Sequence, residues 1–426
     1  MKKEIPVVTN TVMVDYNLSS KPGSTPSSIT SELLSRNLKG YMQGLTRGST
    51  RDAVVQTTEL ILSNLLNAHS QNYEALVFPT GSRNFKRTRY MPSFLKEHVV
   101  SKTIAILEDA QIVVKEGGTG MPIKVATQLS PTGYNTVQEA TRLKLTESID
   151  IGLTSHGDFQ VRPDSEVVIL KSNKVTPKSS SELLDYSNNS KLGKEVSERI
   201  RPKVRAINEF SAKQSITYLG EVQCNRSATT YSRIFNGGSL KKGGRYFGHY
   251  AQTLPSAERK LIRIDGQEVM DLDYQTMFYN LLLAHDGADL PNAGDAFSIP
   301  GYTQFRKQFK KLAYAMLSSS KPLTRFPEGF NKGGWDQGFS KLKNLLTEHL
   351  PLLLKYDGSG VCLQLMRIES DIITKACENM MAMGNGFVIM HDGLLVSKDA
   401  KYPEGCMEKA YKDVVGWTPV ITKEYH

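Results

Sequence analysis

The sequence predicts an α+β protein with more than one domain. Segments in which apolar residues recur with helical spacing alternate with short apolar runs that are typical of strands. The chain has 426 residues, which is more than one ordinary hydrophobic core accommodates and enough for two or three domains. A polar stretch over residues 171–192 indicates a domain boundary.

The overall charge is the first indication of a partner. The formal net charge is +10 at pH 7 and the pI is about 9.2, which favours a polyanionic partner such as nucleic acid. Charge that serves only solubility would give the same balance. The four cysteines are scattered without a CxxC pair, which argues against a zinc site or a disulfide framework. No apolar run approaches the ~20 residues that span a bilayer, so we expect a cytoplasmic protein without a membrane partner.

The N-terminal part is expected to begin with a flexible arm. Residues 1–45 are rich in Ser, Thr, Pro and Gly, most of all over residues 21–28, and this composition is typical of a loosely held segment. From about Arg51 the spacing becomes helical, because Val55, Leu62 and Leu65 share one face.

Residues 79–128 have the order helix, strand, glycine turn, strand. A basic run at 83–89 precedes a helix that starts at Pro92–Ser93 and has an apolar face. The strand 112–115, the turn 116–120 and the return strand 123–126 follow. This order resembles the last helix and wing of a winged helix-turn-helix, which implies a nucleic-acid-binding region over residues 46–170. An accessory subdomain whose basic run is a solvated face would have the same pattern.

Residues 171–225 are assigned to a linker and a basic helix. The helical pattern runs from about Gly193 to Ala212 and is expected to kink at Pro202, which interrupts the backbone hydrogen bonds. Its many Lys and Arg side chains suit contact with a duplex backbone. An ordinary exposed helix would look the same.

Asp273 is the first candidate for chemistry. It lies in the strand-like run 269–275, where period-two alternation puts Asp271, Asp273 and Gln275 on one face. A carboxylate on a rigid strand is a good Mg²⁺ ligand. Phosphoryl transfer at two metals, which lie ~3.5–4 Å apart, needs a second carboxylate from elsewhere in the fold.

Asp392 is the candidate for that second carboxylate. Residues 386–397 contain two apolar strand runs joined by His391, Asp392 and Gly393, and the glycine favours a tight turn with the acid at its tip. Placed beside the Asp273 strand, this hairpin would bring the two acids together. Taken alone, it is an ordinary structural hairpin.

A helix near residues 303–317 supplies cations. Arg306, Lys310 and Tyr314 are spaced four apart and therefore share one face. Arg and Lys on that face can bind triphosphate oxygens, and the Tyr ring can stack on a base or sugar. Lys307 and Lys311 show that a lysine-rich helix also produces this spacing by chance.

Together these segments resemble the family A DNA polymerases and the related single-subunit phage-type RNA polymerases. Asp271–Gln275 is similar to motif A, the Arg306 helix to motif B, and His391–Gly393 to motif C. Two further segments match in order: Gly244–Arg245 followed by residues 252–255, and residues 369–376 before motif C. The resemblance covers residues 225–400 and implies a right-hand palm with an antiparallel sheet and helical fingers over residues 226–426, with the basic helix as a thumb-like element.

The resemblance also implies roles for individual residues. Asp273 and Asp392 would be catalytic and would bind two Mg²⁺ ions, with Mn²⁺ as a possible substitute. The incoming nucleotide would be bound by Arg306, Lys310 and Tyr314. Contact with the primer–template would come from Arg245 and Gln252 near the growing end and from His391 at the primer terminus.

Three departures from the family pattern bear on these roles. Gln275 replaces the usual Ser, and Gly393 replaces a third acid. No glycine occurs over residues 315–319, late in motif B. Phe278 stands five residues after Asp273, where the DNA enzymes have a Glu that blocks a ribose 2′-OH. A bulky ring there could still exclude ribose, so we expect Phe278 to select deoxynucleotides.

The resemblance implies a template-directed nucleotidyltransferase, specifically a DNA-directed DNA polymerase of a phage or mobile element. Its partners would be a nucleic acid primer–template, nucleoside triphosphates and replication proteins. Two alternatives stay open. The same palm could make RNA, as a primase or single-subunit RNA polymerase. The chain could also be a non-catalytic DNA-binding replication initiator or regulator.

Overall fold

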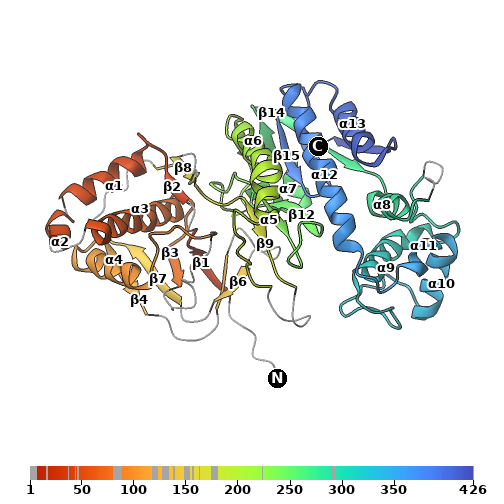
Figure 1. The fold of residues 1–426 in the computed structure, drawn as a ribbon, viewed down its shortest axis with the longest axis horizontal. Helices are drawn as coiled ribbons and strands as arrows, with labels where there is room; N and C mark the ends of the chain where they lie inside the picture. Colours follow the sequence, from red (N-terminus) through yellow and green to blue (C-terminus); the bar gives the residue numbers. More distant parts are fainter. Residues whose placement is uncertain are drawn as a thin grey trace. The chain divides into compact units, whose positions relative to one another are not determined.

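The computed structural model describes residues 7–15, 18–36, 38–43, 45, 48–79, 89–117, 123–126, 134–137, 140–147, 154–155, 158–162, 164–173, 181–222, 224–288 and 294–425 (Figure 1). The chain forms two compact units. The first comprises residues 1–167, 221–231 and 248–256, and the second comprises residues 168–220, 232–247 and 257–426. The units therefore interleave in sequence, and each is described by itself.

A six-stranded mixed sheet organises the first unit. Its order is β4 (Val113–Glu116), β7 (Ala140–Leu145), β3 (Ala75–Pro79), β1 (Val7–Met13), β5 (Ile123–Ala126) and β6 (Tyr134–Val137). Strand β1 runs parallel to both of its neighbours, whereas the other pairs are antiparallel. A separate two-stranded ladder joins β2 (Leu18–Ser20) to β8 (Phe159–Val161).

Helices supply most of the core of this unit. The long helix α3 (Gly48–Ser70) packs on α4 (Glu97–Asp109), on α1 (Thr25–Arg36) and on β3, and the short α2 (Lys39–Gln43) follows α1. Buried apolar side chains of α3 and α4 interlock between these elements, among them Ile61, Leu65, Val100, Ile104 and Leu107. The helical spacing predicted for both segments is thus present, although α4 begins at Glu97 rather than at Pro92–Ser93.

The prediction of a flexible arm over residues 1–45 is wrong for the described part of that segment. Strand β1 lies inside the six-stranded sheet, and α1 buries Thr30 and Leu33. Helix α1 also packs on α3. The polar composition did not predict this order, because strand pairing with distant residues and a few buried apolar side chains stabilise the segment. Neither feature depends on average composition.

The predicted wing is also wrong. Strands β4 and β5 do not pair with each other, because β7, β3 and β1 lie between them in the sheet. Strand β4 instead pairs with β7, in the register Val113 with Leu145. Strands close in sequence often form a hairpin, but here the pairing is decided by non-local partners that the local pattern does not reveal. The predicted turn residues 118–120 and the basic residues 83–88 lie outside the described residues. Arg89 pairs with Glu166 at 3.1 Å.

The second unit contains the strand that carries Asp273. Its main sheet is antiparallel, in the order β10 (Ile216–Tyr218), β13 (Ile262–Ile264), β14 (Gln267–Tyr274), β16 (Gly393–Ser397) and β15 (Phe387–Met390), and β17 (Ile421–Tyr425) also pairs with β14. A three-stranded sheet joins β12 (Gly243–Phe247), β11 (Ser232–Phe235) and β9 (Val168–Leu170). Strand β14 is central because it has partners on both edges.

Helix α12 (Cys362–Ala382) connects the parts of the second unit. It packs against α13 (Pro403–Val415), β12, α8 (Met277–Asp286), α9 (Arg306–Ser318) and α6 (Arg201–Ser211). In Figure 1, α13 and the strands β14 and β15 lie toward one end of α12, while α9, α10 (Phe339–His349) and α11 (Leu352–Lys355) gather at the other end. The buried stripe of α12 follows helical spacing through Leu365, Glu369, Ile372, Ala376 and Met380, and Glu369 is its charged member.

The predicted basic helix is interrupted near its proline. Helix α5 (Lys191–Glu195) continues through a π-helical turn, Val196–Ile200, into α6. The N–H group of Arg201 donates to the carbonyl of Val196, five residues earlier, and Pro202 follows in the first turn of α6. Proline has no N–H group to donate, and the first turn of a helix does not need one, so Pro202 is tolerated where α6 begins.

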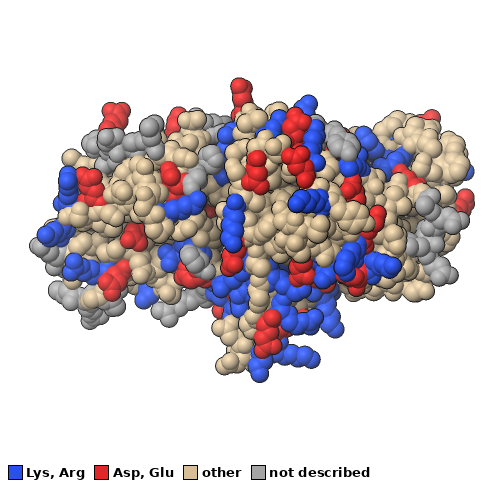
Figure 2. All heavy atoms as spheres, turned by 90° about the horizontal axis from the view of Figure 1, so that it is seen from above, with Lys and Arg blue, Asp and Glu red and all other residues tan. Residues whose placement is uncertain are grey.

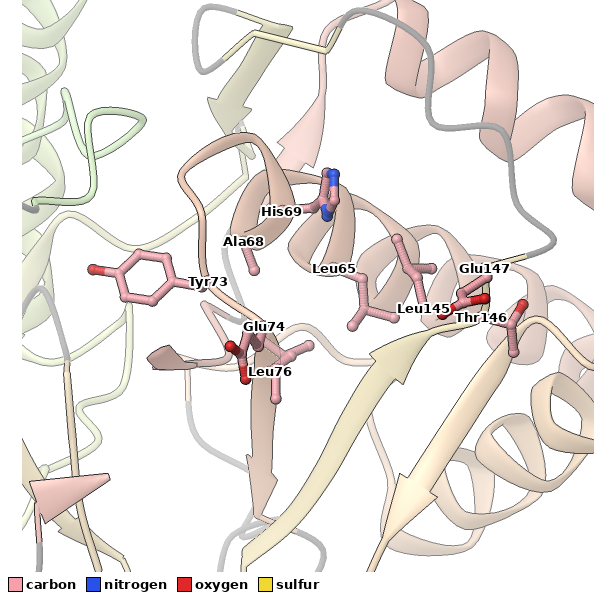
Figure 3. A pocket seen from close by; sticks show the side chains of 10 residues that line it. Leu65, Ala68, His69, Tyr73, Glu74, Leu76, Leu145, Thr146 and Glu147 are labelled. Carbon is pink, nitrogen blue, oxygen red and sulfur yellow. The ribbon is translucent and has the colours of Figure 1, made fainter. Parts of the chain in front are cut away.

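The first unit contains a cavity of about 340 Å³ between α3 and the ends of β3 and β7 (Figure 3). Its apolar lining includes Leu65, Leu76 and Leu145, and its titratable groups are His69, Tyr73, Glu74 and Glu147. None of the predicted site residues lines it. Figure 2 shows Lys and Arg side chains spread over the drawn face and interspersed with Asp and Glu. Among the described helices, none combines the length and the apolar character needed to cross a membrane.

Candidate active site

Asp273 lies near the end of the central strand β14. The side chains of Leu272 and Tyr274 are buried, whereas those of Asp271 and Asp273 are half-buried, which is the predicted two-residue alternation. One carboxylate oxygen of Asp273, Oδ1, is buried and has no hydrogen-bond partner among the described residues. A buried carboxylate oxygen normally has such a partner, so this one is available to a ligand.

The hairpin β15–β16 carries Asp392. Met390 pairs with Gly393, so His391 and Asp392 form a two-residue loop. Gly393 lies opposite Asp273 on β14, which puts Asp392 beside the end of that strand. His391 adopts φ of 63°, a left-handed conformation that two-residue hairpin loops require and that histidine tolerates better than most residues.

The expected role of Gly393 as the turn residue is wrong. Gly393 lies inside β16, and the positive φ belongs to His391. The glycine is needed for close approach, because a Cβ atom at this position would lie 2.5 Å from the carbonyl oxygen of Leu272. Close packing of β16 against β14 therefore requires a glycine at this position.

The electrostatic environment of Asp273 is that of a crowded acidic site. Burial first, and then the negative charges of Asp392 and Asp271, raise the pKa of Asp273 to about 7, while Lys310 opposes the shift. These interactions show that Asp392 and Lys310 both lie within electrostatic range of Asp273. A cation bound at this position would relieve the repulsion among the carboxylates.

Helix α9 contributes Lys310 and Tyr314 to the site. Burial raises the pKa of the Tyr314 hydroxyl above its usual range, and the charges of Asp392 and Glu369 raise it further. The Tyr314 ring lies 4.5 Å from the ring of Phe278, centroid to centroid. Phe278 is the second residue of α8 and is 4% exposed. Lys310 therefore lies within electrostatic range of Asp273, and Tyr314 lies within electrostatic range of Asp392.

Arg306, one turn before Lys310, is held by Asp295. The Arg306 guanidinium forms an ion pair with the Asp295 carboxylate, and the Arg306 side chain is still 43% exposed. Asp295 also accepts hydrogen bonds from the Phe297 N–H group at 3.2 Å and from the Thr276 hydroxyl at 3.4 Å. Asp295 was missed by sequence analysis, because it lies in an irregular segment without periodicity.

Arg245 on β12 is paired with Glu369 of α12. The guanidinium Nε and Nη2 donate to the two carboxylate oxygens of Glu369 at 2.5 and 2.6 Å. Glu369 is fully buried, and burial raises its pKa while Arg245 opposes that shift. The role of Glu369 was also missed, although a charged residue in the apolar stripe of a helix was a signal for it.

Gly244, immediately before Arg245, has a backbone conformation that favours glycine and no room for a side chain. Gly244 adopts φ of 88°, and a Cβ atom there would lie 2.8 Å from the Phe235 ring and 2.9 Å from the Ser370 hydroxyl oxygen. Its carbonyl accepts a hydrogen bond at 2.8 Å from the buried side chain of Arg233. The Gly-Arg pair of the sequence is thus fixed by packing around α12.

His391 and Gln252 have different surroundings. The His391 ring lies 5.3 Å from the Phe247 ring, and burial together with the charge of Arg245 lowers its pKa, so the imidazole is neutral near pH 7. Gln252 belongs to the first unit, where its side-chain oxygen accepts from the Gly248 N–H group at 3.1 Å. A common site for Gln252 and Asp273 therefore remains a prediction.

The donor set at Asp273 and Asp392 fits Mg²⁺. Both ligands are hard carboxylates, and the unpartnered Oδ1 atom of Asp273 offers a coordination position. Mg²⁺ in phosphoryl-transfer sites is commonly bound by one or two carboxylates and completed by phosphate oxygens and water. Within the described ranges, no group of three or more His, Cys, Asp and Glu side chains is arranged to hold a metal ion.

No protein-family description and no curated protein matches the sequence. Among solved structures, the POL domain of Pol1 from M. smegmatis, in complex with DNA primer-template and dNTP, is similar to this chain with a TM-score of 0.33 and 12% sequence identity. The match covers 55% of this chain and about half, 52%, of that chain. A TM-score this low does not show a shared fold.

Proposed function

We propose that this protein is a template-directed nucleotidyltransferase, and specifically a DNA-directed DNA polymerase of a phage or mobile element. The observation that carries the proposal is the arrangement around Asp273: a buried carboxylate oxygen without a partner, next to Asp392 and within range of Lys310. Two acids and a cation of this kind suit the binding of a metal–triphosphate.

Asp273 and Asp392 would hold the metal ions, with Mg²⁺ as the first choice and Mn²⁺ as a substitute. When bound, these ions would supply positive charge that activates the primer 3′-hydroxyl and neutralises the leaving pyrophosphate. In the reaction, the 3′-oxygen forms a bond to the α-phosphorus and the bond from the α-phosphorus to the pyrophosphate oxygen breaks. The hydroxyl proton passes to solvent.

The cations of α9 would bind the triphosphate. Lys310 faces Asp273 and would neutralise phosphate oxygens there. Arg306 is exposed enough to exchange Asp295 for a phosphate, because exposed ion pairs contribute little to stability. Tyr314 would stack on the sugar or base, with the buried Phe278 ring packed against it. His391, Arg245 and Gln252 would act on the primer–template.

Extension of a primed single-stranded template tests the proposal. The full-length protein with Mg²⁺ and the four dNTPs is expected to extend the primer, whereas Asp273→Ala and Asp392→Ala each lose activity by about 10³-fold or more. Asp271→Asn is the matched control, since it removes a charge from the same face of β14, and it should retain activity within about tenfold. Extension by Asp273→Ala at the wild-type rate would contradict the site.

Substrate comparison separates this proposal from its alternatives. An RNA-synthesising enzyme is the second candidate, because Phe278 stands where the DNA enzymes place a glutamate. Preferential use of NTPs, or synthesis without a primer, would favour that candidate. Binding of a duplex without any synthesis would instead support a non-catalytic DNA-binding initiator or regulator.

A further inference from the structure

We infer that Glu369 is a positioning residue for nucleotide selection: its buried carboxylate fixes Arg245, and Arg245 fixes the Phe278–Tyr314 surface. This inference rests on the proposed function. The four residues come from α12, β12, α8 and α9, all within the second unit. Each link between them is a contact with defined geometry.

The first link is rigid. Glu369 is fully buried in the apolar stripe of α12, and both of its oxygens accept from Arg245. A two-point pair of this kind fixes the plane of the guanidinium as well as its position. Removing one partner of a buried ion pair is costly, because the other charge stays buried and unpaired. Arg245 is 19% exposed and is therefore a less exchangeable cation than Arg306.

The second link passes from Arg245 to the aromatic rings. The guanidinium carbon of Arg245 lies 5.4 Å from the centroid of the Phe278 ring, a cation–π distance. The Phe278 ring in turn lies 4.5 Å from the Tyr314 ring, with 38° between their planes. Phe278 is thus held between a fixed cation and a tyrosine of the nucleotide-binding face.

Selection against a ribose hydroxyl depends on where a bulky side chain stands. A phenyl ring rejects an added hydroxyl only if it cannot move aside, because an apolar pocket alone discriminates weakly against such a group. With Glu369 absent, Arg245 would lose its anchor and Phe278 would lose the fixed cation that lies against its ring. We therefore expect loss of sugar discrimination before loss of deoxynucleotide incorporation.

The test compares the kcat/KM ratio for dNTP over NTP in Glu369→Gln, Arg245→Lys and Phe278→Leu. Glu369→Gln is expected to lower the ratio by about tenfold, mainly through improved use of NTP. Arg245→Lys should act in the same direction, because it keeps the charge but loses the two-point geometry. The double variant Glu369→Gln/Phe278→Leu should show no further loss than Phe278→Leu alone.

Asp357→Asn is the matched control. Asp357 is a nearly buried carboxylate of the same unit that pairs with Lys343 at 2.6 Å, and neither residue belongs to the Glu369–Tyr314 chain. This variant should leave the ratio within twofold of wild type. A ratio within twofold of wild type in both Glu369→Gln and Arg245→Lys would overturn the inference, as would additive effects in the double variant.

A second measurement separates failure of the inference from failure of the proposed function. Wild-type protein that incorporates neither nucleotide refutes the proposed function. Thermal unfolding without nucleotide or metal then decides the inference: in the double variant, the Tm losses of Glu369→Gln and Phe278→Leu should be non-additive, because Arg245 links the two side chains. A loss in the double variant equal to the sum of the two single losses, as the control pair Asp357→Asn/Phe278→Leu should give, would overturn it.

Discussion

Gly393 lies directly opposite Asp273 across the antiparallel pair β14–β16. This register puts Asp392, one residue before Gly393, beside the end of the strand that carries Asp273. Two acids separated by more than a hundred residues in the sequence thereby come within electrostatic range of each other. The register is fixed because a shift by one residue would turn the buried face of β14 outward.

The pKa of Asp273 predicts how stability depends on pH. The folded-state pKa is about 7, against an ordinary value of 3.8, so the folded protein keeps a proton that the unfolded chain releases. The resulting stabilisation is complete below about pH 4 and is lost as the pH rises to 7. Asp273→Asn stays neutral, so in EDTA its Tm should exceed that of wild type increasingly between pH 5 and 8. Each kcal/mol corresponds to about 2–4 °C in a domain of this size.

Magnesium should reverse that difference. At pH 8, added Mg²⁺ is expected to raise the Tm of wild type and to leave Asp273→Asn nearly unchanged. Differential scanning calorimetry of wild type and Asp273→Asn, in EDTA at pH 5 and pH 8 and with Mg²⁺ at pH 8, measures these Tm values. A Tm difference that is the same at pH 5 and pH 8 would contradict the assigned environment of Asp273.

Lys310 and Lys311 allow a matched test of the face of α9. Both side chains are exposed, and Lys310 is the one that acts on Asp273. Lys310→Ala should raise the KM for the incoming triphosphate by about 10–100-fold, because a charge-assisted hydrogen bond is lost. Lys311→Ala removes the same charge from a different face, and steady-state kinetics should give a KM within about twofold of wild type. Equal effects of the two substitutions would exclude a specific role for Lys310.

Gly393 should not tolerate a side chain. Gly393→Ala places a Cβ atom 2.5 Å from the Leu272 carbonyl oxygen, which must displace backbone and cost about 1–3 kcal/mol of unfolding free energy. Gly338→Ala is the control, because Gly338 has φ of −61° and nothing within 4 Å of the added atom. Urea denaturation should show a lower midpoint for the first variant and little change for the second. Wild-type stability of Gly393→Ala would contradict the close packing of β16 on β14.

Phe278 is expected to control sugar choice directly. Phe278→Ala removes the ring that faces Tyr314 and should increase NTP incorporation relative to dNTP by about 10-fold or more. Single-nucleotide incorporation on a primed template measures the ratio. A protein that already prefers NTPs before substitution would favour the RNA-synthesising alternative instead.

The sequence by itself determined the local parts of the site. Alternation over residues 269–275 predicted the face that carries Asp273, and four-residue spacing predicted the common face of Lys310 and Tyr314. Both patterns depend only on the repeat of a strand or a helix, which any single element expresses. The sequence also predicted the two strands on either side of His391 and Asp392, because apolar runs that flank turn residues indicate a hairpin.

Only the tertiary structure decided which elements meet. A flexible arm at the N-terminus and a wing at residues 112–126 were both wrong, because β1 pairs with β3 and β5, and β4 pairs with β7 instead of β5. The sequence likewise did not show that Glu369 pairs with Arg245 or that Asp295 pairs with Arg306. Ion pairs and strand pairs between distant segments depend on how the whole chain closes its loops and fills its core. The local spacing of residues in a single helix or strand does not predict these pairs.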